Sequence, residues 1–438
     1  MSGYREALDA LHRLERFGIR LGLEEMRAIC AASGHPERSA PVLHVGGTNG
    51  KGTTVAVLAA LGTAHGFRTG CYTSPHVLDF RERIRIDGEP IAEDAVGEAW
   101  SRVAARVRRN GLTYFEATTL MAFDHFARAG IDLAVVEVGL GGRLDATNVV
   151  VPEVAVVTNV ARDHEPQLGR ELAGIAREKA GIFKAGIPAL IGDARRAEVR
   201  RVFVEAAGAA GSPLHFFEDE VRLEIRPGEG ETGFDYASPA WRAEGLVLPM
   251  AGAHFAWDAA LALRAWEVAA IRPLAETAAR EAVSGVRPIG RAERWTLDGV
   301  PIVFDVAHNP AAVDQLVAGL RGGSDGRTLL VLGFLADKDW QAMLDGLASL
   351  GGRGWLCGLP DAPAERRLER PDLSRWPGLV WADTVACALA EARRQAALGA
   401  ADRILVTGSF HTVEAAMRAL GRRGPGTFYR TTAAEAAR

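Results

Sequence analysis

The sequence predicts an α/β protein with a larger N-terminal domain, built on a mostly parallel sheet of the P-loop type, and a smaller Rossmann-like C-terminal domain. Short apolar runs rich in Val, Ile and Leu alternate with helical patterns, which is typical of parallel βαβ units. A glycine-rich turn separates the first such run from a helical pattern. Glycine and proline interrupt the alternation at 284–291, after which it restarts, and this indicates domains at 1–287 and 288–438.

The composition is that of a globular protein. The chain has 438 residues, 48% of them hydrophobic and 24% charged, which suits about two or three domains. A net charge of −4 argues against a surface that mainly binds nucleic acid. Four scattered cysteines without a C-x-x-C pair argue against zinc or disulfide frameworks and fit a reducing cytoplasm.

The N-terminus is polar and lacks the apolar core of a signal peptide, and no apolar run is long enough to span a bilayer. We therefore expect a cytoplasmic protein that acts on small molecules, with neither a membrane nor a nucleic acid as partner. We further expect a monomer.

The strongest single signal is the apolar run Val42–Val45 and the turn after it, Gly46–Thr54. Glycines let backbone N–H groups approach an anion, and the helix that follows adds the partial positive charge of its N-terminus. Lys51 supplies a full charge, and a hydroxyl after it can reach a magnesium ion. The spacing departs from the Walker A pattern, because Val45 stands in place of its first glycine and Gly52 in place of its hydroxyl. An ordinary glycine-rich turn is the alternative, but paired threonines behind the lysine favour a phosphate site.

Hydrophobic periodicity places the other elements of the first domain. Helices are predicted at about 4–32 (two helices), 93–109, 113–129, from 170 through 182, and 254–268. Parallel strands are predicted at 68–73, 131–138, 154–158 and 188–191, and antiparallel strands within 213–249.

Polar residues lie at the ends of these strands. A carboxylate such as Glu137, inside an apolar strand, is costly unless it meets a cation, so we interpret it as a metal ligand, with a buried ion pair as the alternative. Asp163 and His164 follow the next strand and are further candidate metal ligands, because the carboxyl ends of parallel strands share one crevice and His164 could meet Glu137 there. The run Gly139–Asn148 begins like a dinucleotide fingerprint, but Leu144 replaces its last glycine, so a dinucleotide loop is not expected.

Two groups of charged residues each have two interpretations. Arg81, Arg83 and Arg85 would share one face of an extended segment, either as a solvated edge or as a clamp for carboxylates or phosphates. Glu178 and Lys179 lie on a predicted helix, where a surface charge pair is the alternative to a role in the site.

The second domain repeats the βα alternation without a phosphate loop or a dinucleotide fingerprint. Strands are predicted at 302–306, 328–333, 355–359, 379–381 and 403–407. The first and last of them end in the polar runs Ala307–Pro310 and Gly408–Thr412, which are candidate binding segments.

Taken in order, these motifs resemble those of the folylpolyglutamate synthases, and more closely the bacterial bifunctional form that also has dihydrofolate synthase activity. That family belongs to the Mur ligases, which are ATP-dependent carboxylate–amine ligases. The resemblance covers nearly the whole chain and rests on the following segments: Gly47–Thr54 with its extra Gly52, Tyr72–His76, Thr113–Glu116, Glu137–Asn148, Glu178–Ile182, Phe304–Pro310 and Thr407–Val413.

The resemblance implies roles for individual residues. ATP would be bound by Thr48, Asn49, Gly50, Lys51, Gly52, Thr53, Asp258, Arg291 and Asp305. Two Mg²⁺ ions would be bound by Ser74, Glu137 and His164, beside a carbamate on Lys179. The pterin-side pocket would be lined by Thr113, Tyr114, Phe115, Glu116, Leu144, Asp145 and Ala146, and the amino-acid site by His308 and Ser409. The family usually has asparagine where Asp258 stands, and aspartate is expected to accept a hydrogen bond from the adenine amino group but not to donate one.

The activity implied by the resemblance is the addition of L-glutamate to dihydropteroate, to the γ-carboxyl group of tetrahydrofolate, or to both, in folate biosynthesis and one-carbon metabolism. ATP would phosphorylate the acid to an acyl phosphate, which the amine of glutamate then attacks. His308 could accept the proton of the amine, or the amine could react unaided. Lys51, Lys179 and His308 are the expected catalytic residues. The alternatives are a Mur-type ligase for another acid and a nucleotide-dependent switch without ligation.

Overall fold

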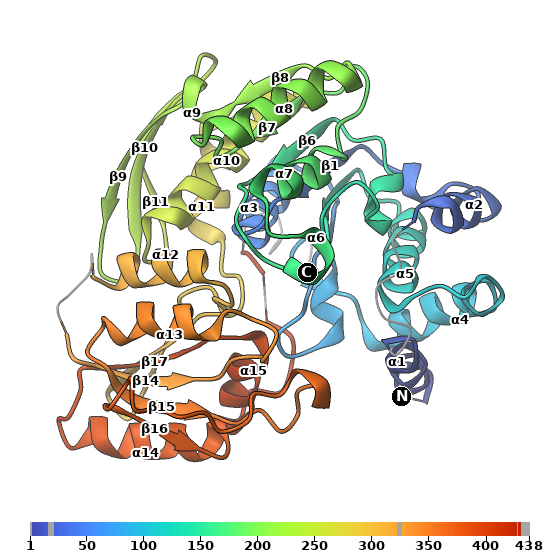
Figure 1. Cartoon of the computed structure of the whole chain (residues 1–438). Coiled ribbons are helices and arrows are strands. Elements are labelled where there is room, and N and C mark those ends of the chain that lie inside the picture. Colours follow the sequence, from blue (N-terminus) through green and yellow to red (C-terminus); the bar gives the residue numbers. More distant parts are fainter. Residues whose placement is uncertain (1, 16–21, 322–325, 427, 431–438) are drawn as a thin grey trace.

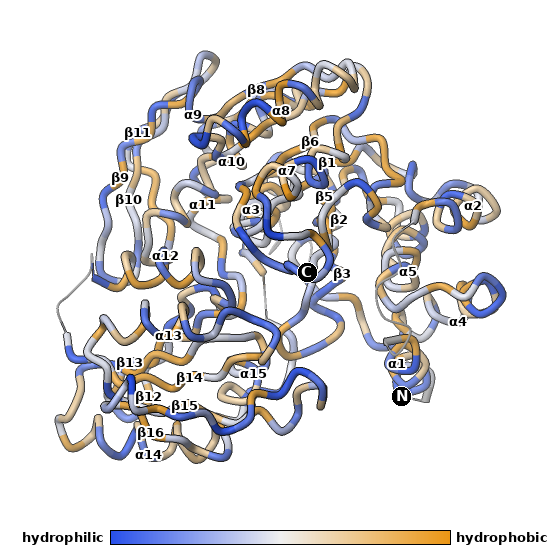
Figure 2. The backbone as a smooth tube through the Cα atoms, viewed as in Figure 1, coloured by the Kyte–Doolittle hydropathy of each residue, from blue (hydrophilic) through white to orange (hydrophobic). Residues whose placement is uncertain are grey.

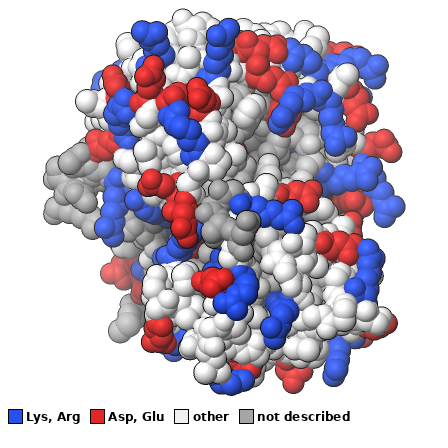
Figure 3. Space-filling view, turned by 90° about the vertical axis from the view of Figure 1, so that its left-hand side faces the viewer, with Lys and Arg blue, Asp and Glu red and all other residues white. Residues whose placement is uncertain are grey.

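The computed structural model of the chain describes residues 2–15, 22–321, 326–426 and 428–430 (Figure 1). The first part of the chain forms one lobe and the last third forms a second lobe beneath it in this view. Figure 2 shows hydrophobic residues along the strands and on the helix sides that cover them. On the face in Figure 3, positive and negative side chains are interspersed.

An eight-stranded sheet organises the first lobe, in the order β4-β3-β2-β5-β1-β6-β7-β8. Its strands are β1 (Val42–Gly46), β2 (Thr69–Tyr72), β3 (Ile84–Ile86), β4 (Glu89–Pro90), β5 (Leu133–Glu137), β6 (Val154–Val157), β7 (Ala189–Ile191) and β8 (Leu214–Phe216). All pairs from β2 to β8 are parallel, and β3 and β4 add an antiparallel edge. The predicted parallel strands are confirmed, because apolar runs of this kind are stable only where both faces of a sheet are covered.

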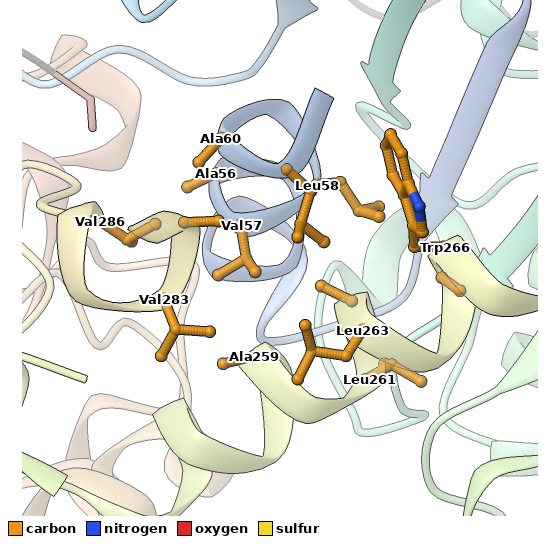
Figure 4. Close-up of a cluster of buried hydrophobic side chains, with 14 of the residues drawn as sticks. Ala56, Val57, Leu58, Ala60, Ala259, Leu261, Leu263, Trp266, Val283 and Val286 are labelled. Atoms are coloured by element: carbon orange, nitrogen blue, oxygen red, sulfur yellow. The ribbon is translucent and has the colours of Figure 1, made fainter. Parts of the chain in front are cut away.

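Helices cover both faces of this sheet. They are α1 (Ser2–Glu15), α2 (Glu24–Ala32), α3 (Lys51–Ala64), α4 (Glu93–Asn110), α5 (Tyr114–Ala129), α6 (Glu165–Leu168), α7 (Leu172–Ala180), α8 (Ala197–Ala210), α9 (Phe217–Glu220), α10 (Ala253–Ala269) and α11 (Glu276–Gly285), with 3₁₀ turns at Pro36–Arg38, Phe80–Arg83 and Ala146–Val149. Helix α3 is buried on nearly all sides, and its Val57 and Leu58 face Ala259 and Leu263 of α10 (Figure 4). The phosphate-loop helix is therefore a fixed central element of the core.

A separate three-stranded antiparallel sheet packs on α10 and α11. It consists of β9 (Arg222–Pro227), β10 (Thr232–Ala237) and β11 (Arg242–Leu248), in the order β11-β10-β9. The predicted antiparallel region is confirmed for these strands, whereas β8, at its start, joins the parallel sheet.

The second lobe is built on a six-stranded sheet in the order β12-β13-β17-β14-β15-β16. Its elements are β12 (Glu293–Leu297), β13 (Val300–Phe304), α12 (Pro310–Arg321), β14 (Thr328–Leu332), α13 (Trp340–Ala348), β15 (Arg353–Cys357), a 3₁₀ turn (Ala364–Arg366), β16 (Leu379–Ala382), α14 (Val385–Ala397), β17 (Arg403–Thr407) and α15 (Phe410–Ala419). The five predicted strands are confirmed. Strand β12 was not predicted; it forms a hairpin with β13 through Asp298 and Gly299, both of which have positive φ.

Two segments cross between the lobes. Val77 and Leu78, which follow β2, lie in the hydrophobic core of the second lobe. In the other direction, the end of the described chain returns to the first lobe, where Tyr429 Oη is 2.7 Å from Thr63 Oγ1 and Arg85 donates to the carbonyl of Gly426. We propose domains at 1–287 and 288–438 that exchange these two segments. Within the described chain, no helix has the length and apolarity that a bilayer span requires.

Candidate active site

The phosphate loop joins β1 to α3 and leaves the N-terminus of that helix open. Gly50 precedes the helix with φ 83°, and no side chain caps the first amides of α3. Gly47 has φ 137°, and a Cβ there would lie 1.8 Å from Thr158 Oγ1. Both glycines are therefore needed for the path of the loop, and the uncapped amides and helix dipole suit an anion.

Residues at the exit of β6 hold this loop in place. Asn159 Oδ1 accepts from the backbone N–H of Asn49 at 3.0 Å, and Asn159 Nδ2 donates to the carbonyl of Asn49 at 3.0 Å. Thr158 Oγ1 donates to the same carbonyl at 2.6 Å, and Thr48 Oγ1 exchanges hydrogen bonds with the backbone of Ala161. Thr158 and Asn159 were not predicted individually, although the sequence predicted polar residues after this strand, with Asp163 and His164 as the candidates.

Lys51 lies at the centre of the charged groups. Its Nζ donates to the carbonyl oxygens of Gly47 and Thr48 at 3.3 and 3.0 Å. Burial is the main cause of the pKa shifts of Glu137, His164 and Lys179, and the positive charge of Lys51 acts on all three in the downward direction. Glu137 and His164 thus lie near the same charge, as the sequence predicted for neighbouring strand exits, and Lys179 joins them from a helix.

Glu137 ends β5 and accepts a hydrogen bond from the backbone N–H of Ser74 at 3.2 Å. Burial raises the pKa of its carboxyl group, while the charges of Lys51, Arg291 and Arg83 act in the opposite direction. Glu137 forms no ion pair with another described residue, so its carboxylate oxygens suit a hard cation.

His164 stands at the start of α6, and burial is the main cause that lowers the pKa of its imidazole to about 4. A neutral imidazole has a lone pair for a metal. No group of three or more His, Cys, Asp or Glu side chains in the described parts of the chain could hold a metal ion by itself. Mg²⁺ commonly completes its shell with water and substrate phosphates, so a site of Glu137, His164 and Ser74 fits such an ion.

Lys179 is buried at the end of α7. Burial, together with the charge of Lys51, lowers the pKa of its amine to about 7. Glu178 pairs instead with Arg143 at 2.8 Å, so the predicted alternative, a surface pair between Glu178 and Lys179, is wrong. No acidic residue that the structure describes forms an ion pair with this amine, and burying an unpaired charged amine is costly, which is consistent with its lowered pKa.

Asp258 lies on α10 against the phosphate loop. A Cβ on Gly50 would be 2.3 Å from its Oδ1, so the carboxyl group touches the loop backbone. Burial raises the pKa of this carboxyl group to about 8, while the charge of Arg291 opposes the shift. The group is therefore protonated near neutral pH and, like an amide, can both donate and accept a hydrogen bond.

The second lobe presents Arg291 to the loop. The guanidinium Nη2 lies 3.5 Å from the position that a Cβ on Gly52 would occupy, and its carbon is 5.6 Å from the ring centroid of Phe410. Asp305 nearby accepts from the backbone N–H groups of Ala292 and Ala307 at 2.9 and 2.8 Å. Arg291, a predicted ATP-binding residue of the second domain, thus lies beside the phosphate loop. Asp305, the other predicted residue of that domain, holds the backbone next to it.

A polar network joins the lobes. Asn309 and Asn49 pair through their side-chain amides at 2.9 and 3.2 Å. Asp163 accepts from Asn309 at 3.1 Å and pairs with His308 at 3.2 Å and with Lys338 at 2.5 Å. Burial alone would raise the pKa of Asp163, but these partners bring it below its usual range. The carboxylate of Asp163, a candidate metal ligand in the sequence, is thus engaged by side chains of the second lobe. Asn309, within the predicted polar run Ala307–Pro310, was not singled out, and Lys338 was not predicted.

The ring of His308 has oxygen partners on both nitrogens. Nδ1 lies 2.9 Å from the carbonyl of Val306, and Nε2 faces Asp163. Ser409 is buried as the N-cap of α15, where its hydroxyl accepts from the backbone N–H of Thr412 at 3.1 Å. His308 and Ser409 therefore both have structural partners in addition to any role toward an amino acid.

The residues predicted for the acid pocket gather around the start of α5. Thr113 and Glu116 form the capping box of this helix, and Asp145 caps the turn 146–149 by accepting from Thr147. Phe115 packs against the backbone at Gly139, where a Cβ would lie 2.4 Å from its ring. Ala146 is buried, while Leu144 is half-buried. The polar side chains here are thus mostly engaged locally, which leaves the aromatic rings to contact a flat ligand.

A cavity of about 1050 Å³ opens between the lobes. Asn49, His164, His308 and Lys338 are among its lining residues. Its walls come from the exit of β6, from α12 and from the segment before α13. A ligand bound to the first lobe could therefore meet a ligand bound to the second lobe inside this cavity.

Comparison with known proteins gives concordant results. Residues 45–264 match the Mur ligase middle domain, and residues 290–410 match the glutamate ligase domain of Mur ligases. The chain is 35% identical to the dihydrofolate synthase/folylpolyglutamate synthase of Escherichia coli strain K12, over 96% of each sequence.

Solved structures agree. One is a Mycobacterium tuberculosis folylpolyglutamate synthase complexed with ADP and AMPPCP; its TM-score is 0.87 at 31% identity, covering 96% of this chain and 100% of the other. Another is a bifunctional folylpolyglutamate synthase/dihydrofolate synthase with Mn, AMPPNP and L-glutamate bound, with a TM-score of 0.82 at 32% identity, covering 94% and 97%.

Proposed function

Because this chain belongs to the Mur ligase family and, within it, to the folylpolyglutamate and dihydrofolate synthases, we propose that it adds L-glutamate both to dihydropteroate and to reduced folates. It is an ATP-dependent carbon–nitrogen ligase of folate metabolism. The observation that carries the proposal is the convergence of Lys51, Glu137, His164 and Lys179 beside the open N-terminus of α3.

We assign the triphosphate to the loop from Thr48 to Thr53. The backbone amides and the α3 N-terminus donate to phosphate oxygens, and Lys51 adds a full charge. Arg291 would add a second charge from the other lobe, and Asp305 fixes the backbone on both sides of it. Asn49, held by Asn159 and Asn309, is rigid before the nucleotide arrives.

We assign divalent cations to Glu137, His164 and Ser74, in keeping with the Mn-bound relative. When bound, such cations neutralise phosphate charge while an anionic acid approaches. The chain keeps Glu137 dry and next to Lys51, and it keeps His164 neutral.

Lys179 is proposed to be carbamylated. An uncharged amine can attack CO₂, forming a carbamate with loss of a proton, and the lowered pKa of Lys179 supplies that uncharged form near neutral pH. The new carboxylate would balance Lys51 and act as an oxygen ligand near the metal site.

The acid is proposed to lie along Tyr114 and Phe115, with Asp145 and Ala146 beside it, and the amino acid in the cavity between the lobes. Both ring nitrogens of His308 already have oxygen partners, the carbonyl of Val306 and the carboxylate of Asp163, so neither is free to take up a proton from the amine. Of the two routes for the amine proton, this arrangement favours an amine that reacts without a histidine base and leaves His308 to position the lobes.

A product-detecting assay tests the proposed function. Purified protein is given L-glutamate and MgATP with dihydropteroate, tetrahydrofolate or a UDP-linked acid, and phosphate and amide products are both quantified. We expect glutamate-dependent amide products from both folate acids and none from the UDP-linked acid. Product from the UDP-linked acid alone would indicate another Mur-type ligase, and phosphate release without any amide would indicate a nucleotide-dependent switch.

The pKa of Asp258, which lies against the phosphate loop, can be tested through the pH dependence of stability. In the unfolded chain its pKa is about 3.9, so between about pH 4 and pH 8 the folded protein keeps a proton that the unfolded chain has lost. Stability should therefore fall as pH rises through this window. Asp258→Asn should raise the free energy of unfolding at pH 8 by about 2 kcal/mol or more and leave it nearly unchanged at pH 4.

Urea unfolding between pH 4 and pH 9 measures this effect, and titration with ADP at pH 8.5 measures its consequence for nucleotide binding, which should be tighter in Asp258→Asn. The exposed Asp361→Asn is the matched control. An equal pH slope in the wild type and in Asp258→Asn would show that the carboxyl group is ionised in the folded protein.

We also propose a cytoplasmic monomer. The cytoplasmic location is supported by four free cysteines, three of them buried, which suit a reducing compartment.

A further inference from the structure

The three arginines after β2 do not share a face, because Phe80–Arg83 forms a 3₁₀ turn instead of an extended strand. Arg81 pairs with Asp79 at 2.8 Å. Arg85 is buried and donates to three backbone carbonyls, those of Glu82, Gly88 and Gly426. Each of these two arginines is thus satisfied by the protein, and neither is a clamp.

Arg83 differs from both. It is 7% exposed, its Nε donates to His76 Nδ1 at 2.9 Å, and its guanidinium carbon lies 5.2 Å from the ring centroid of Tyr114. The two terminal nitrogens make no hydrogen bond, and the guanidinium no ion pair, with any residue that the structure describes. A guanidinium removed from water without an acid is unfavourable, which indicates that an anion completes the site.

The neighbours of Arg83 do not supply that anion. Glu82 directs both carboxylate oxygens to the backbone N–H groups of Val77, Leu78 and Asp79. His76 carries no negative charge, and its Nδ1 is already the acceptor for Arg83 Nε. Glu137 accepts a hydrogen bond from the backbone N–H of Ser74 at 3.2 Å and forms no ion pair with Arg83.

The position of Arg83 indicates which anion it serves. On one side is Tyr114, at the start of the helix assigned to the acid pocket, and on the other are the Ser74–His76 segment and Glu137, assigned to the metal. An acid that lies along Tyr114 and presents its carboxylate to the metal site must pass this guanidinium. The planar fork of arginine matches a carboxylate through two parallel hydrogen bonds.

We propose that Arg83 binds the reacting carboxylate of the acid substrate through its terminal nitrogens and thereby selects an anionic acid over neutral analogues. This inference rests on the proposed ligase function and adds a substrate-binding residue to it. Arg83 donates hydrogen bonds to the carboxylate and takes no proton from it. The hydrogen bond from Arg83 Nε to His76 Nδ1 fixes the orientation of the guanidinium group.

The test compares a charged ligand with a neutral one. Binding of dihydropteroate and of its neutral carboxamide is measured by fluorescence titration in the presence of Mg²⁺ and AMPPNP, without turnover. We expect the wild type to prefer the acid and Arg83→Gln to bind the acid about 10- to 100-fold more weakly, with the affinity for the carboxamide nearly unchanged. Arg83→Lys, which keeps the charge but not the fork, should lie between them.

Arg81→Gln is the matched control, because it removes a guanidinium two residues away that already has an acidic partner. Its preference for the acid should equal that of the wild type. Equal losses of acid and carboxamide binding in Arg83→Gln would show a purely structural role, and an undiminished preference for the acid would overturn the inference; a wild type without any preference would do the same. A wild type that binds neither ligand would instead contradict the proposed function. If Arg83→Gln does not fold, the comparison of Arg83→Lys with Arg81→Gln decides the question by the same criterion.

Discussion

Lys51→Ala is expected to lower the rate of ATP-dependent ligation by at least about 10²- to 10³-fold, because it removes the positive charge of the phosphate loop. The fold should stay intact, since among the residues that the structure describes Lys51 Nζ bonds only the carbonyls of its own loop. The thermal midpoint should shift by no more than a few degrees, as for a change of about 1 kcal/mol.

Coupled phosphate release and direct detection of the amide product measure this effect. Lys51→Arg keeps the charge with a different shape and should retain part of the activity, whereas the exposed Arg177→Ala should retain all of it. Near-normal turnover by Lys51→Ala would remove the loop lysine from the mechanism.

Lys179→Ala is the second change with a large expected effect. It removes the proposed carbamate, so ligation should fall by about 10²- to 10³-fold, and formate or acetate should partly restore it by occupying the vacated space. NMR with ¹³C-bicarbonate should show a carbamate carbon in the wild type and not in the variant. Full activity of Lys179→Ala without additive, or the absence of a carbamate signal in the active wild type, would refute carbamylation.

Lys179 should also make stability depend on pH, in the direction opposite to that expected for Asp258. Its pKa is about 7 in the folded protein, below the usual value of 10.5, so between these values the unfolded chain binds the additional proton and stability rises with pH. Lys179→Met should therefore be more stable than the wild type at pH 6, while being inactive. Loss of activity with a raised thermal midpoint would separate the chemical role from misfolding.

Much of the fold could be predicted because its signals are local. Runs such as Val154–Val157 are apolar throughout and can only be strands buried on both faces. The Asp298-Gly299 turn was a sequence signal for the β12–β13 hairpin that periodicity alone did not use. The capping box of Thr113 and Glu116 could likewise have been read from its spacing, next to the pocket role that the resemblance implied.

The candidate site was predictable in its strand exits but not in the contacts across the lobes. Glu137 ends β5, and Lys51 and His164 lie after β1 and β6. These three strands are parallel neighbours, so all three residues lie at the same edge of the sheet. The pairing of Asn49 with Asn309 joins residues 260 positions apart, and no local pattern announces it. The face shared by Arg81, Arg83 and Arg85 was wrongly predicted because alternation assumes an extended backbone, and hydrogen bonds to Glu82 wind this segment into a turn.

The return of the last described residues to the first lobe has a consequence for biosynthesis. Tyr429 meets Thr63 across 366 positions, and the buried guanidinium of Arg85 donates to the carbonyl of Gly426. While the ribosome is still making the second lobe, the nucleotide-binding lobe lacks these partners and exposes the surface that they later cover. Completion of the sheet of the first lobe is therefore not enough for its maturation, which waits until Gly426 and Tyr429 have been translated and have packed against it.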